Sequence, residues 1–385
     1  MTDDIIIIGS VFAARQLIKN LRRLDSRLSL RLIAADSCDE YNKPELSQVF
    51  SQGQRAEDLT RLPARAFAES HNLMLHPHTP VTRIDRAAQR VETHAGVFTY
   101  RKLVLALGAE ARLPPIPGRE LMHTLNSQQE YRRAEAELQG AQRVLLLGGG
   151  LIGTELAMDL NRAGKQVMLV DRAAALLATL MPPEVSARLQ HRLIGAGVQM
   201  SFNAEPAALA RCDDQIIATL TDGRTLHTDA VVCAIGLLPN LALAQEAGLQ
   251  TRHGIVVDDH LATSDPAIFA LGDCAEIQGR LWPYLQPAQL AAMTLAKNLT
   301  GAQERLRLPP MLIKVKTPDL PLHLAGEATD PDLHWAIEAG RDGLVACGRD
   351  DQQQLRAFVV SEGRMKQAFL LLKQLPDSTR HVCTM

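Results

Sequence analysis

Runs of apolar residues alternate with turn and helix signals in the first part of the chain. Ile5–Ile8 is an unbroken β-branched run, typical of a strand that is buried on both faces of a parallel sheet. A glycine-containing turn follows, and residues 15–21 carry the pattern of a helix. Leu28–Ala34 predicts a second strand, and Asp36 lies two positions beyond its end. This order predicts a βαβ unit of the kind that binds dinucleotides.

The turn after the first strand departs from the dinucleotide fingerprint at one position. The fingerprint G-x-G-x-x-G/A would run from Gly9 to Ala14, but Val11 stands where its second glycine is expected. That glycine lets the backbone approach a pyrophosphate, and here a Cβ fills the space. Taken alone, this unit is consistent either with a dinucleotide site or with an ordinary βαβ unit that binds nothing.

A second unit of the same kind is complete. Arg143–Leu147 predicts a buried strand, and a helix is expected to continue to Asn161. A further strand, Gln166–Val170, ends at Asp171, whose carboxylate could bond an adenosine ribose and repel a 2′-phosphate. This favours NADH over NADPH, although the neighbouring Arg172 could instead receive that phosphate. The fingerprint glycines are Gly148, Gly150 and Gly153.

Composition limits the classes of partner. The chain has 385 residues, 46% of them hydrophobic, which is enough for two or three domains with cores of their own. Its net charge of −2 and pI of about 6.6 exclude a global positive field for a nucleic acid or an anionic membrane. No apolar stretch reaches the roughly 18 residues of a membrane span, and no signal peptide precedes the first strand. We therefore expect a cytoplasmic protein without nucleic-acid or membrane partners.

The cysteines show no metal-binding or disulfide pattern. No two of them form a C-x-x-C arrangement, whereas zinc sites and iron–sulfur clusters need closely spaced thiolates. The sequence predicts no metal site and six reduced, mostly buried thiols. They are Cys38, Cys212, Cys233, Cys274, Cys347 and Cys383.

Five motifs in order resemble the FAD-dependent pyridine nucleotide reductases of the glutathione-reductase fold, in their rubredoxin and ferredoxin reductase branch. These motifs are residues 41–47, 103–109, 148–155, 232–236 and 268–276. A narrower resemblance, to the NADH reductases that serve flavorubredoxin in bacterial nitric oxide detoxification, is carried by residues 13–17, 39–44, 125–131 and 316–318. The resemblance implies an α/β protein with two Rossmann-like dinucleotide-binding domains and a small C-terminal α+β domain.

The resemblance also implies roles for individual residues. The FAD-binding residues would be Gly9, Ala14, Asp36, Lys43, Pro44, Gly108 and Asp273, and the NAD-binding residues Gly148, Gly150, Gly153, Glu155, Asp171 and Gly236. Gly108 and Gly236 would be crossing points between domains, where small residues allow two chain segments to approach closely. Glu155 would contact the nicotinamide end, or would be an acid at a helix N-terminus that the macrodipole favours.

Two lysines are the implied catalytic residues. In the resemblance Lys43 and Lys316 lie beside the isoalloxazine, where an ammonium would stabilise the reduced anionic flavin. The alternative is that both are solvated surface lysines. A basic rim of Arg15, Lys43, Arg55, Arg61 and Arg65 could steer an acidic acceptor, or these side chains could be scattered and solvated.

The expected activity is electron transfer without a protein thiol. The branch that uses cysteines carries them where this chain has Leu46-Ser47-Gln48, and Cys38 lacks a partner, so electrons would leave the flavin directly. The acceptor would be rubredoxin or the rubredoxin domain of flavorubredoxin, with NADH as the reductant. Alternatives are an NADH-dependent ferredoxin reductase of an oxygenase system and a flavin- or nucleotide-binding protein without turnover.

The motifs give the expected domain boundaries. Residues 1–108 and 236–302 would form a split FAD-binding domain, 112–232 the NAD-binding domain, and 306–385 the C-terminal domain. Residues 376–381 begin with a proline and show no apolar period, so a loosely held end is expected there.

Overall fold

A computed structural model of the chain describes residues 2–318 and 320–376. Residues 377–381 of the expected loose end lie outside the described residues, and so does Cys383. The described chain forms two compact units. Unit 1 takes in the described residues of Met1–Lys43, Asp58–Glu110 and Leu237–Leu308, and unit 2 those of Pro44–Glu57, Ala111–Gly236 and Pro309–Met385.

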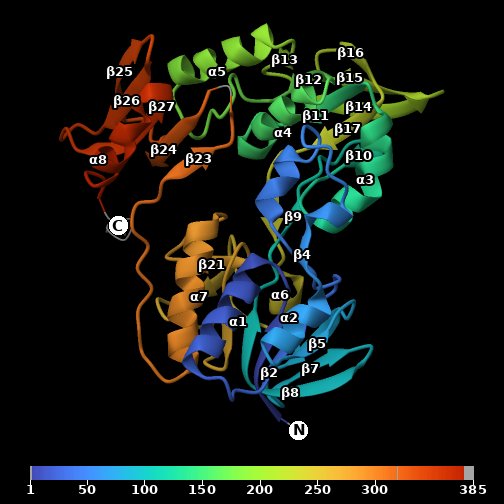
Figure 1. The fold of residues 1–385 in the computed structure, drawn as a ribbon, viewed down its shortest axis with the longest axis vertical. Coiled ribbons are helices and arrows are strands. Elements are labelled where there is room, and N and C mark those ends of the chain that lie inside the picture. Colours follow the sequence, from blue (N-terminus) through green and yellow to red (C-terminus); the bar gives the residue numbers. More distant parts are fainter. Residues whose placement is uncertain (1, 319, 377–385) are drawn as a thin grey trace. The chain divides into compact units, whose positions relative to one another are not determined.

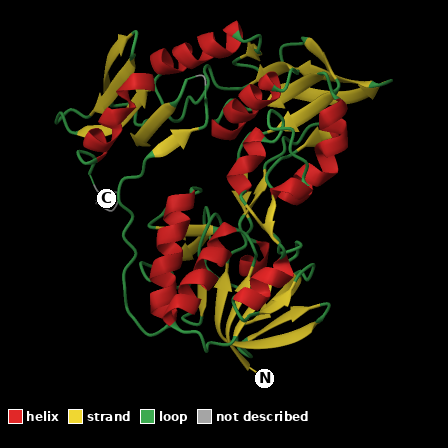
Figure 2. Ribbon diagram, in the orientation of Figure 1, coloured by secondary structure: helices red, strands yellow, loops and turns green. Residues whose placement is uncertain are grey.

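Unit 1 is built on a seven-stranded sheet in the order β5-β2-β1-β8-β7-β6, with β20 also paired to β8. β1 lies at its centre because Ile5–Ile8 are at most 5% exposed and cannot face water on either side. Helices α1 and α7 pack together beside this sheet (Figures 1 and 2). The strands are β1 (Thr2–Ile8), β2 (Leu30–Ile33), β5 (Met74–His76), β6 (Val81–Asp85), β7 (Arg90–Thr93), β8 (Gly96–Leu105) and β20 (Ile268–Ala270), and the two helices α1 (Phe12–Leu24) and α7 (Leu285–Leu299).

Smaller elements complete unit 1. They are the paired strands β3 (Glu40–Tyr41) and β4 (Thr60–Leu62), helices α2 (Ala64–Ser70) and α6 (Ala242–Glu246), and a sheet of β19 (Ile255–Val257), β21 (Ala275–Ile277) and β22 (Arg280–Leu281). The chain passes between the units next to β9 (Ala109–Ala111) and β18 (Leu237–Pro239).

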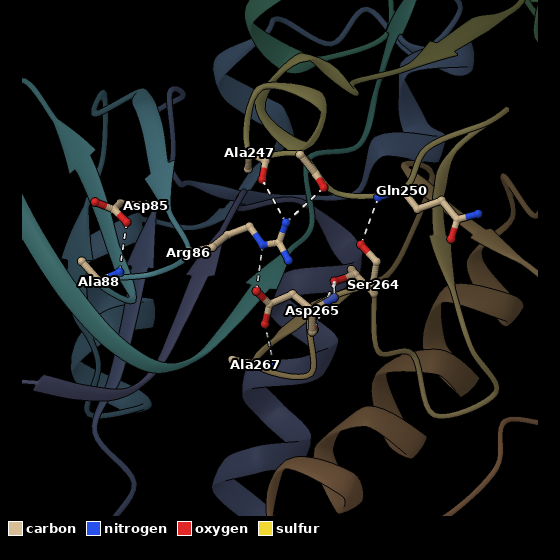
Figure 3. A network of polar contacts seen from close by, with 10 residues as sticks. Asp85, Arg86, Ala88, Ala247, Gln250, Ser264, Asp265 and Ala267 are labelled. Atoms are coloured by element: carbon tan, nitrogen blue, oxygen red, sulfur yellow. Dashed lines mark hydrogen bonds and ion pairs between the residues drawn. The ribbon is translucent and has the colours of Figure 1, made fainter.

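An arginine clamp holds the early and late segments of unit 1 together (Figure 3). Arg86, just after β6, donates from Nε to Asp265 Oδ2 at 2.8 Å and from Nη1 to the carbonyl oxygen of Gly248 at 3.1 Å. Asp265 in turn accepts from the backbone N of Ala267, directly before β20. These partners lie more than 160 positions from Arg86, so the clamp closes a long loop.

The core of unit 2 is a five-stranded parallel sheet in the order β10-β17-β11-β12-β13. The expected strands Arg143–Leu147 and Gln166–Val170 appear with those bounds as β11 and β12. The other strands and the helices are β10 (Met122–His123), β13 (Gln199–Ser201), β17 (Ala230–Cys233), α3 (Gln128–Gly140), α4 (Leu151–Arg162) and α5 (Pro183–Gly195).

Two antiparallel sheets complete unit 2. One is a three-stranded sheet of β14 (Pro206–Cys212), β15 (Gln215–Leu220) and β16 (Thr225–Thr228). The other has the order β23-β24-β27-β26-β25 and is covered by α8 (Ala368–Leu372), with Phe358 and Val360 fully buried between them. Its strands are β23 (Ile313–Val315), β24 (Leu322–Gly326), β25 (His334–Gly340), β26 (Gly343–Arg349) and β27 (Leu355–Ser361).

The structure thus has two α/β units that each contain a βαβ loop, and a C-terminal antiparallel sheet with a helix, as the expected fold class requires. Segment 44–57 packs with unit 2, although in the sequence it interrupts unit 1. The assignment of the two cofactor domains to residue ranges stays a prediction.

Candidate functional site

The turn after β1 depends on a glycine. Gly9 has a φ of +105°, and a Cβ there would lie 2.1 Å from the carbonyl oxygen of Ala106, which no real side chain tolerates. Its backbone N donates to Ile33 O at 2.9 Å, and Ala106 N donates to Ile8 O at 2.9 Å. These bonds hold the turn against the ends of β2 and β8.

The turn after β11 in unit 2 repeats this geometry. Gly148 has a φ of +103°, and a Cβ there would lie 2.5 Å from Ala234 O. Its N donates to Val170 O at 2.8 Å, and Ala234 N donates to Leu147 O at 2.8 Å. The structure therefore confirms that the chain contains two strand-turn-helix loops of equivalent design, one in each unit.

The third fingerprint position distinguishes the two loops. A Cβ on Gly153 would lie 1.9 Å from Gly148 O, so α4 sits against its loop at a distance only glycine allows. In unit 1 this position holds Ala14, whose methyl is buried, with the residue 1% exposed. Gly150 stands apart from both, because a Cβ there would meet no atom of the described chain within 4 Å. Its side of the loop is open, as a site for a pyrophosphate requires.

An acidic residue closes each loop. Asp171, directly after β12, accepts from Gly149 N and, at 2.6 Å, from Ala173 N. Asp36, shortly after β2, accepts from Ser10 Oγ at 2.6 Å and from Cys38 N at 2.9 Å. Both carboxylates are thus fixed at the turn that leads into α1 or α4, where the fingerprint places the ribose of a dinucleotide.

Asp273, Lys43 and the start of α1 lie together in unit 1. A Cβ on Gly272 would come within 2.9 Å of the Ala13 Cβ, which places the Gly272 turn against the first turn of α1. Burial raises the pKa of the Asp273 carboxyl, and the positive charge of Lys43 opposes this. The N-terminus of α1 and the positive charge of Lys43 suit an anionic group, whereas the Asp273 carboxyl suits a hydroxyl donor, and a flavin dinucleotide contains both kinds of group.

Glu155 is the centre of a buried polar cluster in unit 2. It is 3% exposed, and it accepts from Ser47 Oγ at 2.6 Å and from the backbone N of Lys316 at 2.9 Å. The Lys316 Nζ lies 3.5 Å from Glu155 Oε2 and donates to Ser47 Oγ and to the carbonyl oxygen of Pro44. Lys316 is therefore not a freely solvated lysine. Glu155 lies beyond the first turn of α4, so the macrodipole does not explain its position.

Asp159 was missed by the sequence reasoning. It lies one turn after Glu155 on α4, is 4% exposed, and accepts from the backbone N of Phe50 at 2.8 Å and of Ser51 at 3.1 Å. Burial raises the pKa of its carboxyl. Glu155 and Asp159 together fix the segment that follows Lys43 to α4. The only sequence signal is their spacing of four, which places both on one helix face.

Two expected roles need correction. Gly108 and Gly236 lie beside boundaries between the units, as expected of crossing points, but a small side chain is not needed there, because a Cβ on either would meet no atom of the described chain within 4 Å. Their φ values of +66° and +114° are the reason for glycine. Arg15 does not belong to an exposed basic rim, since it is 4% exposed, lies 4.4 Å over the Phe67 ring and donates to Cys38 O. The exposed arginines of the expected rim are Arg55, Arg61 and Arg65.

Cys38, which lies between the expected flavin-binding residues Asp36 and Lys43 in the sequence, has the properties of a structural thiol. Cys38 is 1% exposed, and burial raises the pKa of its thiol to about 12, so it is protonated at neutral pH and a poor nucleophile. The five described cysteines are all free. Among the described residues no group of three or more His, Cys, Asp or Glu side chains is arranged to hold a metal ion.

Comparison with known proteins shows which protein family the chain belongs to. Residues 3–294 match the family described as pyridine nucleotide-disulphide oxidoreductase, and residues 305–375 match the family described as rubredoxin binding C-terminal domain. The chain belongs to the pyridine nucleotide-disulphide oxidoreductase family.

Its relatives are similar over their whole lengths. The protein named "Nitric oxide reductase FlRd-NAD(+) reductase" from Escherichia coli O139:H28 is 60% identical over 98% of this chain and 100% of its own length, and the protein of that name from Shigella flexneri is 59% identical over the same shares. Among solved structures, a ferredoxin reductase from Rhodopseudomonas palustris is 26% identical with a TM-score of 0.88, covering 98% of this chain and 96% of its own. A putidaredoxin reductase, solved in covalent complex with putidaredoxin, is 26% identical with a TM-score of 0.87, covering 97% and 94%.

No helix within the described part of the chain combines the length and the apolar character that crossing a membrane requires.

Proposed function

We propose that this chain is an NADH-dependent flavoprotein reductase that passes electrons to rubredoxin, in particular to the rubredoxin domain of flavorubredoxin during nitric oxide detoxification. The observation that carries the proposal is the match of residues 305–375 to a rubredoxin-binding domain. This domain follows, in the sequence, the two equivalent dinucleotide loops at Gly9 and Gly148. The named relatives at 59–60% identity support the same acceptor.

FAD, when bound, supplies the chemistry that lets a two-electron donor serve a one-electron acceptor. In unit 1 the loop from Gly9 to Ala14 would bind its pyrophosphate at the N-terminus of α1, with Asp36 on the adenosine ribose. Asp273 would bond the ribityl and phosphate region, while Lys43 and Pro44 would lie toward the isoalloxazine. Gly108 would provide the turn after β8 that its positive φ requires.

In unit 2 the loop of Gly148, Gly150 and Gly153 would bind the NADH pyrophosphate, with Asp171 on the adenosine ribose. Glu155 would act toward the nicotinamide end, and it also accepts from the Ser47 hydroxyl and from the backbone N of Lys316. Lys316 is proposed as a flavin-tuning residue whose ammonium is held by three oxygen partners. Gly236 would complete the turn after β17. None of these residues need act as a general acid or base, because hydride transfer depends on positioning.

The domain proposal follows from these assignments. Residues 1–108 and 236–302 would bind FAD, residues 112–232 NADH, and residues 306–385 the acceptor. We propose a cytoplasmic location, since the acceptor and the NADH pool are there.

The function is tested by mixing the NADH-reduced protein anaerobically with oxidised rubredoxin, and in a matched reaction with a [2Fe–2S] ferredoxin of similar charge. We expect rapid bleaching of the rubredoxin iron–thiolate band and slower reduction of the ferredoxin. Faster reduction of the ferredoxin would reassign the protein to an oxygenase system. A purified protein that shows no flavin absorbance and takes up no added FAD would end the reductase proposal.

A further inference from the structure

Val11 occupies the position in the first dinucleotide loop that Gly150 occupies in the second. It is the N-cap residue of α1, with a φ of −78° and a ψ of −168°. Gly150, the N-cap residue of α4, has a φ of −73° and a ψ of −170°. Because these angles lie in the extended region, valine adopts them without strain. The chain therefore keeps the backbone of the fingerprint and adds a side chain to it.

The equivalence of the loops gives the direction of that side chain. Gly9 and Gly148 have φ values within 2° of each other, and a Cβ on either would collide with the carbonyl oxygen at the end of the neighbouring strand. The first helical bonds also correspond, from Arg15 N to Val11 O and from Thr154 N to Gly150 O. A Cβ on Gly150 would point into open space. By this correspondence the isopropyl group of Val11 lies in the same open space above its own loop.

That space is where an anion reaches the N-terminus of α1. The first turn of α1 contains no acidic residue, and no side chain caps it, so its N–H groups are suited to a phosphate. A phosphate oxygen must come within about 2.9 Å of a backbone nitrogen to be bonded. A methyl carbon keeps other heavy atoms at about 3.5 Å or more, so the valine methyls compete with the phosphate for this space.

We propose that Val11 is an affinity-determining residue that weakens the hold of unit 1 on the FAD pyrophosphate, so that FAD exchanges with the free pool. The inference rests on the proposed function, because it takes FAD to be the ligand of the first loop. The intact glycine loop of unit 2 contains no such obstruction.

The experiment compares the full-length wild-type protein with V11G and V11A. Glycine is well accepted at an N-cap, so V11G is expected to fold. Purified holoprotein is diluted, release of FAD is followed by its fluorescence, and the dissociation constant is measured by equilibrium dialysis against FAD. We expect V11G to bind FAD at least about tenfold more tightly than wild type, with V11A between them, and to release it correspondingly more slowly.

A matched control is placed in the other loop. Gly150→Val puts the same side chain on the same backbone, and it should weaken NADH binding while leaving FAD affinity at the wild-type value. If V11G and wild type bind FAD equally tightly, the inference is overturned, while the proposed reductase function stands. If neither V11G nor wild type binds FAD at all, the inference and the proposed function both fall.

Discussion

Glu155 and Lys316 are joined twice in unit 2, once through the Lys316 backbone N at 2.9 Å and once through its Nζ at 3.5 Å. Since Glu155 follows the glycine loop on α4 and Lys316 follows β23, the pair connects the proposed NADH-binding loop to the start of the C-terminal sheet. The third partner, Ser47, brings in the segment that follows Lys43. One buried carboxylate thus orders three segments that are far apart in the sequence.

The first prediction concerns this pair. Lys316→Met leaves the buried Glu155 charge without its nearest cation, and we expect a loss of about 1–3 kcal/mol in the free energy of unfolding, measured in urea. Lys297→Met is the matched control, because Lys297 and Glu304 form an ion pair at 2.9 Å that is 43% and 49% exposed. Exposed pairs contribute roughly 0–1 kcal/mol. Equal losses in the two variants would show that burial of Glu155 does not matter.

The second prediction separates folding from binding in the second loop. Gly153→Ala places a methyl 1.9 Å from Gly148 O and should lower the melting temperature of the protein. Gly150→Ala meets no atom of the described chain, so its melting temperature without nucleotide should stay near wild type. Its affinity for NADH, measured by calorimetry, should fall because the methyl faces the pyrophosphate. If Gly150→Ala binds NADH as tightly as wild type, the pyrophosphate does not bind at this loop.

The third prediction is a pH dependence at Asp229. The Arg143 side chain, with the backbone N–H groups of Arg143 and Gln142, holds the pKa of Asp229 below its usual value. A lowered folded-state pKa contributes stability that is present above the unfolded pKa of about 3.9 and is lost as the pH falls through the folded pKa. Asp229→Asn should therefore cost about 1–2 kcal/mol at neutral pH. The gap in melting temperature between the two proteins should narrow as the pH falls below about 4, and a gap that stays constant from pH 7 down to about pH 2 would contradict the assignment.

The fourth prediction concerns the flavin. If Lys43 lies toward the isoalloxazine, as we propose, Lys43→Met removes a positive charge that stabilises the reduced anion, and the midpoint potential of the bound FAD becomes more negative. Lys102→Met is the control, because Lys102 is a lysine of unit 1 that donates to Pro266 O at 3.1 Å near the surface. Spectroelectrochemical titration of both holoproteins gives the answer. An unchanged potential in Lys43→Met would remove Lys43 from the mechanism.

Some of this arrangement follows from local sequence. The strands Arg143–Leu147 and Gln166–Val170 were predicted to the residue, because a strand buried on both faces is an unbroken apolar run that ends where the polar loop begins. The expected acids Asp36 and Asp171 lie at their loops, because the length of a βαβ unit fixes where its second strand ends. Helix α1 begins at Phe12, three residues before the expected start at Arg15, because its N-cap residue is Val11, and valine is not a typical capping residue.

The polar partners of the candidate site could not be predicted in the same way. Glu155 bonds residues 108 and 161 positions away, and no local pattern encodes such pairings. The positive φ of Gly108 and Gly236, rather than close approach, also emerges only from the folded backbone. Arg15 looked like a surface cation because its stacking on Phe67 depends on α2, which is formed by a later segment.

The pairing of β20 with β8 determines when the central sheet of unit 1 can be completed during synthesis on the ribosome. The central sheet of unit 1 receives β20 next to β8 only after about 160 further residues have been translated, at about 5–20 residues per second. For that interval of roughly ten to thirty seconds residues 103–105 of β8 lack the neighbouring strand β20, while β7 already pairs with residues 96–99. The parallel sheet of unit 2 ends at Cys233 and emerges complete in the meantime, so of these two sheets the one that begins first is completed second.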